Sequence, residues 1–230
     1  MIVSHKWRYI FVKNRKTAGT SVEIALSQYC GSDDIVTRIM AEDEVVRREL
    51  GGLGPQNDRV PIWSYGVRDF ARLILKGKGK LAFGNHSPAG HIRQMLGAET
   101  WDSYHTFSIE RNPWDRVISV YYWRGWGKEG RPLTDFLRSN IYRKFVADAL
   151  GIYMDGNEPL IDRVLKFEAL EEELEQQRLL IGLPEPLKLP RTKTGTRKDR
   201  RHYSEVLSNE ERDIIGRDFK PIIDLMGYEF

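Results

Sequence analysis

The sequence has few of the features that mark secreted, membrane-spanning or strongly charged proteins. Cys30 is the only cysteine, so no intramolecular disulfide can form and a disulfide-stapled secreted fold is excluded. No run approaches the ~20 apolar residues that span a bilayer. The N-terminus also lacks an apolar stretch followed by a cleavage site. These absences predict a cytoplasmic chain that does not insert into a membrane.

The charge balance is almost even. Lys and Arg total 36 against 33 for Asp and Glu, and a formal net charge of +3 is too small to indicate a nucleic-acid partner. The chain is 40% apolar and 30% charged, as globular proteins are. Its 230 residues predict one domain spanning residues 1–230. The basic run at residues 191–201 is a candidate anion site.

Short apolar runs alternate with helical patterns along the chain. Strands are predicted at residues 8–12, 81–83, 106–109 and 163–167. Helices are predicted at residues 22–29, 41–50, 65–75, 114–123 and 168–181, and a final helix begins with a capping box at Ser208 and Glu211. This alternation predicts an α/β fold with a central parallel sheet and helices on both faces.

Residues 13–21 (KNRKTAGTS) lie between the first predicted strand and the first helix. Backbone N–H groups and a helix N-terminus can cradle a phosphate at such a place. A nucleotide triphosphatase would carry GxxxxGK[ST] here, whereas Lys16 precedes Gly19 in this chain. The loop therefore indicates phosphate binding of another kind. The alternative is an ordinary basic turn capped by Thr20 or Ser21.

KTAGTS after a strand resembles the 5'-phosphosulfate loop of sulfotransferases that use 3'-phosphoadenosine 5'-phosphosulfate (PAPS), particularly the carbohydrate-type family. The resemblance implies a P-loop-like fold and places Lys16 against the sulfate and the bridging oxygen. It also implies a set of loop residues that bind the nucleotide: Arg15, Lys16, Thr17, Ala18, Gly19, Thr20 and Ser21. The family more often has proline where this chain has Arg15.

A second segment, RNPWDRVISVY, resembles the 3'-phosphate motif RNPxxRxxSxY of the same family. The resemblance implies that Arg111 and Ser119 bind the 3'-phosphate, for which the planar fork of an arginine is well suited. For Arg116, phosphate contact and pairing with an acid such as Asp115 both stay open. For Arg111 we favour phosphate contact over such pairing.

A basic loop stands where the family closes a flap over the nucleotide. Its residues are Lys193, Thr194, Gly195, Thr196 and Arg197. A solvated charged loop is the alternative interpretation of this segment. The chain after residue 163 also resembles the usual ending of the family, although more loosely than the two phosphate motifs.

His86, in FGNHSPAG, stands near the place where family members carry a histidine taken as the general base. An imidazole titrates near neutral pH and can accept the proton of an acceptor hydroxyl. His91 and Glu110 are alternatives, although we expect Glu110 to form an ion pair or a strand-end hydrogen bond. No set of residues has metal-ligand spacing, so we expect no metal.

We therefore expect a sulfotransferase that moves a sulfuryl group from PAPS to a hydroxyl on a carbohydrate or glycoconjugate. A nucleotide-dependent phosphotransferase and a non-catalytic protein that binds nucleotides or sulfated ligands are the alternatives. We expect acceptor specificity to come from residues 51–80 and 125–140. Four aromatic residues there or nearby could stack on sugar rings or equally belong to the core: Trp63, Tyr65, Trp123 and Trp126.

Overall fold

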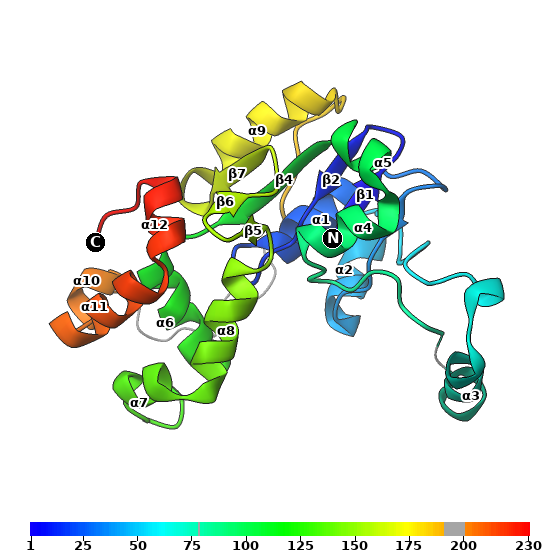
Figure 1. Ribbon diagram of the computed structural model, residues 1–230. Coiled ribbons are helices and arrows are strands. Elements are labelled where there is room, and N and C mark those ends of the chain that lie inside the picture. Colours follow the sequence, from blue (N-terminus) through cyan, green and yellow to red (C-terminus); the bar gives the residue numbers. More distant parts are fainter. Residues whose placement is uncertain (78, 191–200) are drawn as a thin grey trace.

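The computed structural model describes residues 1–77, 79–190 and 201–230. Within them, a five-stranded sheet has the order β3-β1-β2-β4-β7, and a separate two-stranded ribbon pairs β5 with β6 (Figure 1). The strands are β1 (Ile2–Ser4), β2 (Tyr9–Phe11), β3 (Ile35–Val36), β4 (His105–Glu110), β5 (Met154–Asp155), β6 (Glu158–Pro159) and β7 (Arg163–Lys166).

The five-stranded sheet is mixed, so the prediction of a parallel sheet is confirmed for three neighbouring strands and wrong for the other two. Strands β2, β4 and β7 are parallel to one another, whereas β1 is antiparallel to both β2 and β3. Residues 5–8 turn the chain back between β1 and β2, and Arg8 has a left-handed φ of 55° there. A strand as short as β1 is too brief for a periodic signal, which is why the sequence did not reveal it.

Helices lie before, between and after these strands. The first six α-helices along the described chain are α1 (Gly19–Ser27), α2 (Ala41–Glu49), α3 (Val67–Lys76), α4 (Ala89–Leu96), α5 (Ala98–Asp102) and α6 (Pro113–Trp123). Those that follow are α7 (Leu133–Arg138), α8 (Asn140–Leu150), α9 (Leu170–Ile181), α10 (Tyr203–Val206), α11 (Asn209–Asp218) and α12 (Lys220–Met226). Two 3₁₀ turns, η1 (Ile62–Ser64) and η2 (Phe167–Ala169), complete the set in the described residues.

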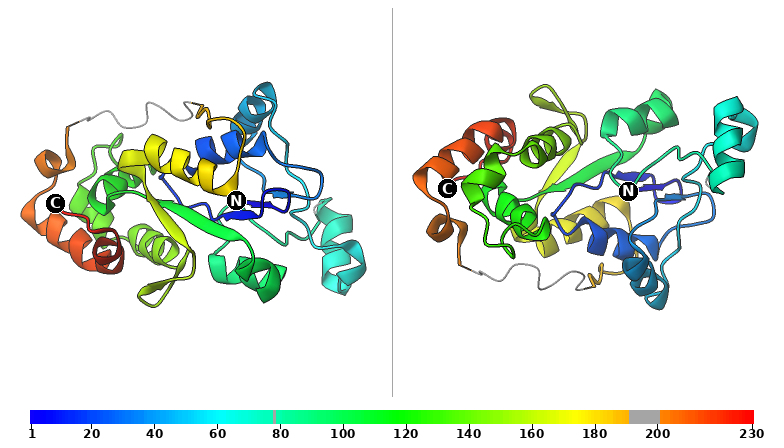
Figure 2. Two further views of the ribbon diagram at one scale, coloured as in Figure 1. Left: turned by 90° about the horizontal axis from the view of Figure 1, so that it is seen from above. Right: turned by 90° about the horizontal axis from the view of Figure 1, so that it is seen from below.

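Helices cover both faces of the sheet, as predicted, because side chains alternate along each strand. One face packs Tyr9 and Phe11 of β2 against α1 and α9, and the other packs Ile10 against α4 and α5. Figure 2 shows these helices on opposite sides of the strands. A third apolar cluster joins α6, α7, α8, α11 and α12. The chain is thus α/β, with a mixed sheet flanked by helices.

Most of the predicted helices and strands are confirmed, but two predictions were wrong. Residues 81–83 form no strand of the sheet: Leu81 makes one isolated bridge to Arg59, and the N–H groups of the next two residues donate to the carbonyl of Asp58. The final helix is broken into α11 and α12 at Phe219, because Pro221 cannot continue the helical hydrogen bonding. Among the described residues, every helix is too short or too polar to cross a membrane.

Candidate functional site

The loop between β2 and α1 has an unusual backbone. Lys16 and Ala18 both adopt left-handed φ values, of 64° and 57°, which residues with a Cβ rarely do. Helix α1 begins immediately afterwards at Gly19 and has no acidic residue in its first turn. The first backbone N–H groups of a helix have no intrahelical partner and carry partial positive charge. The loop therefore presents N–H groups and the basic Lys16 at one end of α1, a suitable arrangement for an anion.

Gly19 is needed at the start of α1 because two groups of the same loop pack against it. A Cβ there would lie 2.8 Å from Cγ of Lys13 and 3.2 Å from the carbonyl oxygen of Asn14. The Lys13 side chain is buried and donates from Nζ to Glu23 at 2.8 Å and to Asn85 at 2.9 Å. Glycine thus allows the loop to close over a buried lysine.

Arg116 joins the two sequence motifs. Its side chain is fully buried in α6, and its guanidinium donates to Asn14 Oδ1 at 2.6 Å and to the carbonyl of Arg15 at 2.9 Å. It also forms an ion pair of 2.6 Å with Glu110, at the end of β4. Asn14 and Tyr153 donate to the other oxygen of the Glu110 carboxylate. Pairing of Arg116 with an acid is confirmed, but the acid is Glu110 and not Asp115.

Arg111 lies next to this network and is partly exposed to solvent. Asn112 caps α6 and Pro113 occupies its first turn, so the helix begins directly after Arg111. The guanidinium donates to Asp115 from Nε at 2.8 Å, lies 4.5 Å from the centre of the Phe167 ring, and reaches the carbonyl of Lys16 at 3.4 Å. Arg111 thus pairs with Asp115, because the i, i+4 spacing on α6 brings them together. Its contact with a phosphate stays a prediction.

Ser119 shares a face of α6 with residues that contact the phosphate loop. Arg116 is three positions before it and Trp123 four positions after it, and such positions line one side of a helix. Arg116 bonds the loop, and the Trp123 ring centre is 5.7 Å from Lys16 Nζ. Half-buried Ser119 therefore faces the loop side of α6.

His86 is hydrogen-bonded to the same loop. Its Nδ1 lies 3.0 Å from the carbonyl oxygen of Lys13, and because a carbonyl only accepts, Nδ1 carries the proton and Nε2 is left as an acceptor. Burial, together with the charges of Arg15 and Lys13, lowers the pKa of His86 to about 3. The ring is thus neutral near pH 7, in the tautomer that a base requires.

The two alternatives to His86 are placed differently. His91, on α4, donates from Nε2 to the carbonyl of Ala82 at 2.8 Å. Glu110 is fully buried and accepts hydrogen bonds from four groups, including Arg116 and Tyr153. The ion pair expected for Glu110 is confirmed. Two of the three candidate bases contact the phosphate loop: His86 through the carbonyl of Lys13, and Glu110 through the side chain of Asn14.

A buried cluster of charged groups around Glu23 holds the phosphate loop against α1. The Glu23 carboxylate, within α1, pairs with the N-terminal amine of Met1 at 3.0 Å, with Lys13 at 2.8 Å and with Arg47 at 3.0 Å. Burial alone would raise the pKa of Glu23, but the Met1 amine together with the Lys13 and Arg47 side chains outweighs it and holds the pKa well below its usual range. The cluster fixes α1, and with it the Lys13 side chain.

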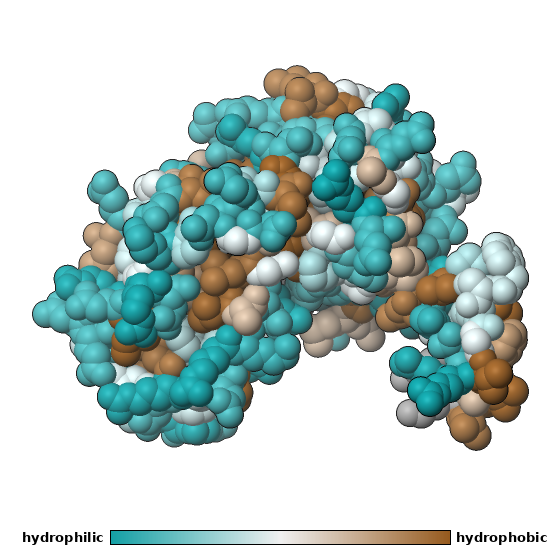
Figure 3. Space-filling view, viewed as in Figure 1, coloured by the Kyte–Doolittle hydropathy of each residue, from teal (hydrophilic) through white to brown (hydrophobic). Residues whose placement is uncertain are grey.

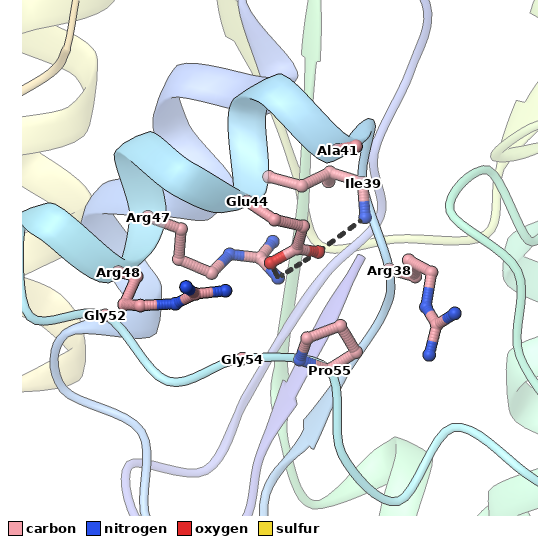
Figure 4. A pocket seen from close by; sticks show the side chains of 9 residues that line it. All are labelled: Arg38, Ile39, Ala41, Glu44, Arg47, Arg48, Gly52, Gly54 and Pro55. Atoms are coloured by element: carbon pink, nitrogen blue, oxygen red, sulfur yellow. Dashed lines mark hydrogen bonds and ion pairs between the residues drawn. The ribbon is translucent and has the colours of Figure 1, made fainter.

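A hollow of about 430 Å³ adjoins this cluster on the side of α2. Figure 4 shows Arg47 and Arg48 extending from α2 beside it, with Glu44 bonded to Arg47. Its lining is Arg38, Ile39, Ala41, Glu44, Arg47, Arg48, Gly52, Gly54 and Pro55. These residues include none of the phosphate loop, so this hollow is separate from the candidate site.

The remaining predicted residues divide into two groups. The five flap residues Lys193, Thr194, Gly195, Thr196 and Arg197 lie outside the described residues. Three of the aromatic residues considered for stacking on an acceptor sugar have different surroundings. Trp126 belongs to the core, Trp123 is 42% exposed beside Lys16, and Trp63 is 90% exposed in the segment before α3. Of these three, Trp123 contacts the phosphate loop, with its ring centre 5.7 Å from Lys16 Nζ.

Sequence reasoning missed four residues that hold the site together: Lys13, Asn14, Asn85 and Tyr153. Lys13 and Asn14 follow a buried strand directly, and buried polar residues at a strand end are a usable signal. Asn85 and Tyr153 gave no such signal, because their partners are 72 and 43 positions away. In the described part of the chain, no three His, Cys, Asp or Glu residues are grouped as metal ligands.

These elements define an α/β chain with a polar, partly buried loop at the end of a strand. An "Uncharacterized protein" of Archaeoglobus fulgidus is 35% identical to it over 107 residues, which are 44% of this chain and 86% of the archaeal protein. The chain belongs to the same family as that archaeal protein. No family model matches the chain. No solved structure matches it. The name of the relative states no activity, so the function has to be argued from the site.

Proposed function

We propose that this protein transfers a sulfuryl group from PAPS to an acceptor hydroxyl on a carbohydrate or glycoconjugate. The observation that carries the proposal is the buried contact of Arg116 with Asn14, Arg15 and Glu110. It brings together two segments, about a hundred residues apart, that resemble the two phosphate-binding motifs of PAPS-dependent sulfotransferases. Two such motifs placed side by side suit a nucleotide with phosphates at both its 5' and 3' positions.

In this proposal the donor lies across the carboxyl ends of β2 and β4. The 5'-phosphosulfate is bound by Lys16 and the first N–H groups of α1, and the 3'-phosphate is bound by Arg111 and Ser119. Asp115 takes two of the five N–H donors of Arg111 and the carbonyl of Lys16 takes a third, which leaves two for a phosphate. These fixed positive groups stabilise the leaving nucleotide, so the proposed reaction has no step that needs a metal.

His86 is the proposed general base. The acceptor oxygen forms a bond to sulfur while the bond from sulfur to the bridging oxygen breaks, and the electron pair leaves with adenosine 3',5'-bisphosphate. The acceptor proton passes to Nε2 of His86, the nitrogen that remains unprotonated when Nδ1 donates to Lys13. With a pKa of about 3 the free ring is a weak base. Bound phosphosulfate adds negative charge nearby and so raises that pKa toward the working range.

The direct experiment is transfer from ³⁵S-labelled PAPS to a panel of sugars, glycolipids and simple alcohols. We expect labelled product with wild type, strong loss with Lys16→Ala and His86→Ala, and little change with the control His91→Ala. Transfer of the γ-phosphate of ATP in the presence of magnesium would replace the proposal with a kinase. Tight binding of the nucleotide without transfer to any acceptor would indicate a non-catalytic binding protein.

A further inference from the structure

Helix α3 has an apolar face that the rest of the described chain leaves open to solvent. Its exposed apolar residues, which fall on one side of the helix at helical spacing, are Val67, Phe70, Ala71, Ile74 and Leu75. Val67 is 88% exposed, and Ile74 and Leu75 are each 81% exposed. Figure 3 shows brown apolar surface on α3 at the edge of the molecule. A contiguous apolar face of this kind marks a surface that binds something.

Basic residues border the apolar face of α3. Arg68 and Arg72 are exposed there, and Asp69 is the one acid of the helix. From residue 67 to residue 80 the sequence has five Lys or Arg, at positions 68, 72, 76, 78 and 80, against one acid, so the net charge is 5 − 1 = +4. This segment alone therefore exceeds the net charge of +3 of the whole chain, and the remaining residues together have a net charge of 3 − 4 = −1.

The α3 segment is held together internally and stands away from the sheet. Figures 1 and 2 both show α3 apart from the layers that cover the sheet. The N–H of Lys80 donates to the Tyr65 hydroxyl at 2.7 Å, the Lys80 side chain pairs with Asp69 at 3.2 Å, and the ring centres of Tyr65 and Phe70 are 5.6 Å apart. These contacts fix the helix and cover its apolar face only at Phe70, so Val67, Ile74 and Leu75 stay exposed.

We propose that the α3 segment binds the surface of an anionic lipid bilayer. An amphipathic helix with Lys and Arg on one side and large apolar residues on the other lies in the interface between headgroups and acyl chains. Trp63, 90% exposed just before the helix, suits the same depth, where tryptophan rings concentrate. A helix of 10 residues is far below the ~20 needed to span, so α3 lies on the membrane and does not cross it.

Charge decides between a membrane and a second copy of the chain on this face. Two copies joined through α3 would bring two segments of net charge +4 together, and like charges repel. An anionic lipid surface supplies the opposite charge, and each Lys or Arg near it strengthens binding. The exposed arginines, Arg68 and Arg72, border the apolar face, where their long stems allow the heads to reach the headgroups.

The test is sedimentation of the full chain with vesicles, either of phosphatidylcholine alone or of phosphatidylcholine mixed with phosphatidylglycerol. We expect binding only to the mixed vesicles, weakened by added salt. Ile74→Asp, and separately Arg68→Glu with Arg72→Glu, should each lower the partition coefficient about tenfold or more. Leu179→Asp is the matched control, because Leu179 on α9 is 64% exposed and lies outside the α3 segment.

Three results would overturn the proposal: no sedimentation with the mixed vesicles, equal binding to both kinds of vesicle, or binding unchanged by Ile74→Asp. A dimer in solution that Ile74→Asp dissociates, without vesicle binding, would assign the face to a second copy instead. Ile74 is exposed, so the variant should keep the wild-type melting temperature; a large drop would mean that the α3 face is buried in the protein and not free to bind lipid. Binding of adenosine 3',5'-bisphosphate separates this proposal from the function proposed above: the residues proposed to bind that nucleotide, Lys16, Arg111 and Ser119, lie outside α3, so Ile74→Asp should leave its affinity unchanged.

Discussion

The guanidinium of Arg116 donates to the side-chain oxygen of Asn14 at 2.6 Å, although the two residues are 102 positions apart. The contact joins the loop before α1 to the helix after β4, and it does so inside the protein, where neither side chain is more than 3% exposed. A fully buried arginine that bonds a loop backbone and a carboxylate at once holds both in one geometry. The relative position of the two motifs in space is therefore fixed by buried contacts of the folded protein.

Replacing Arg116 by methionine should destabilise the protein by about 3–5 kcal/mol, because it leaves the buried Glu110 carboxylate without its cation. Denaturant unfolding measures this free energy. The double variant with Glu110→Gln should recover part of the loss. Arg138→Met is the control, since its ion pair with Glu210 is exposed on both sides and should cost less than about 1 kcal/mol. Equal losses at the two arginines would contradict the buried role of Arg116.

Gly19→Ala should destabilise the protein by about 1–3 kcal/mol, since the added methyl group would meet the buried Lys13 stem and the Asn14 carbonyl. It should also weaken nucleotide binding, because the loop must shift. Gly54→Ala is a suitable comparison, because no atom lies within 4 Å of its Cβ position and its φ is not left-handed. Thermal unfolding of both variants is the measurement; an unchanged melting temperature for Gly19→Ala would show that the loop adapts.

Acid should destabilise the fold partly through His86. The unfolded ring takes up a proton near pH 6.5 and the folded ring only near about 3, so the unfolded state binds more protons between these values. Stability contributed by the neutral ring is therefore lost as the pH falls through that window. In His86→Ala the decline between pH 6.5 and 4.5 should be shallower than in wild type and in the control His91→Ala. Parallel curves for all three proteins would show that His86 is not buried as described.

If the donor lies between Lys16 and Arg111, substitution of Lys16 should chiefly affect turnover and substitution of Arg111 should chiefly affect binding. Lys16→Ala should reduce turnover by about 10²–10³, because charge on the bridging oxygen grows as the sulfuryl group departs. Arg111→Ala should chiefly weaken binding of PAPS and of its product, because a 3'-phosphate contact is the same in the ground and transition states. Steady-state kinetics of both variants distinguish these effects, and the reverse pattern would exchange the two assignments.

How far the sequence predicts this protein depends on whether a feature is local. The helix that begins at Pro113 and the capping box at Ser208 were predicted correctly, because periodicity and cap residues lie within one element. The antiparallel strand β1 was not predicted, because three residues are too few to show an alternating pattern and its pairing with β2 and β3 depends on distant residues. Arg116 was left open for the same reason: its true partners, Asn14 and Glu110, become neighbours only when β2 and β4 pair.

The measurement that tests the proposed donor site most directly is calorimetric titration of the protein with adenosine 3',5'-bisphosphate, compared with AMP and with ATP plus magnesium. We expect the bisphosphate to bind far more tightly than AMP in wild type, and we expect Arg111→Ala to remove most of that difference. Saturating bisphosphate, at ~100 times its dissociation constant, should then stabilise the wild-type fold by about 2.7 kcal/mol. Equal affinity for AMP and the bisphosphate, or binding only of ATP with magnesium, would contradict a site built to bind a 3'-phosphate.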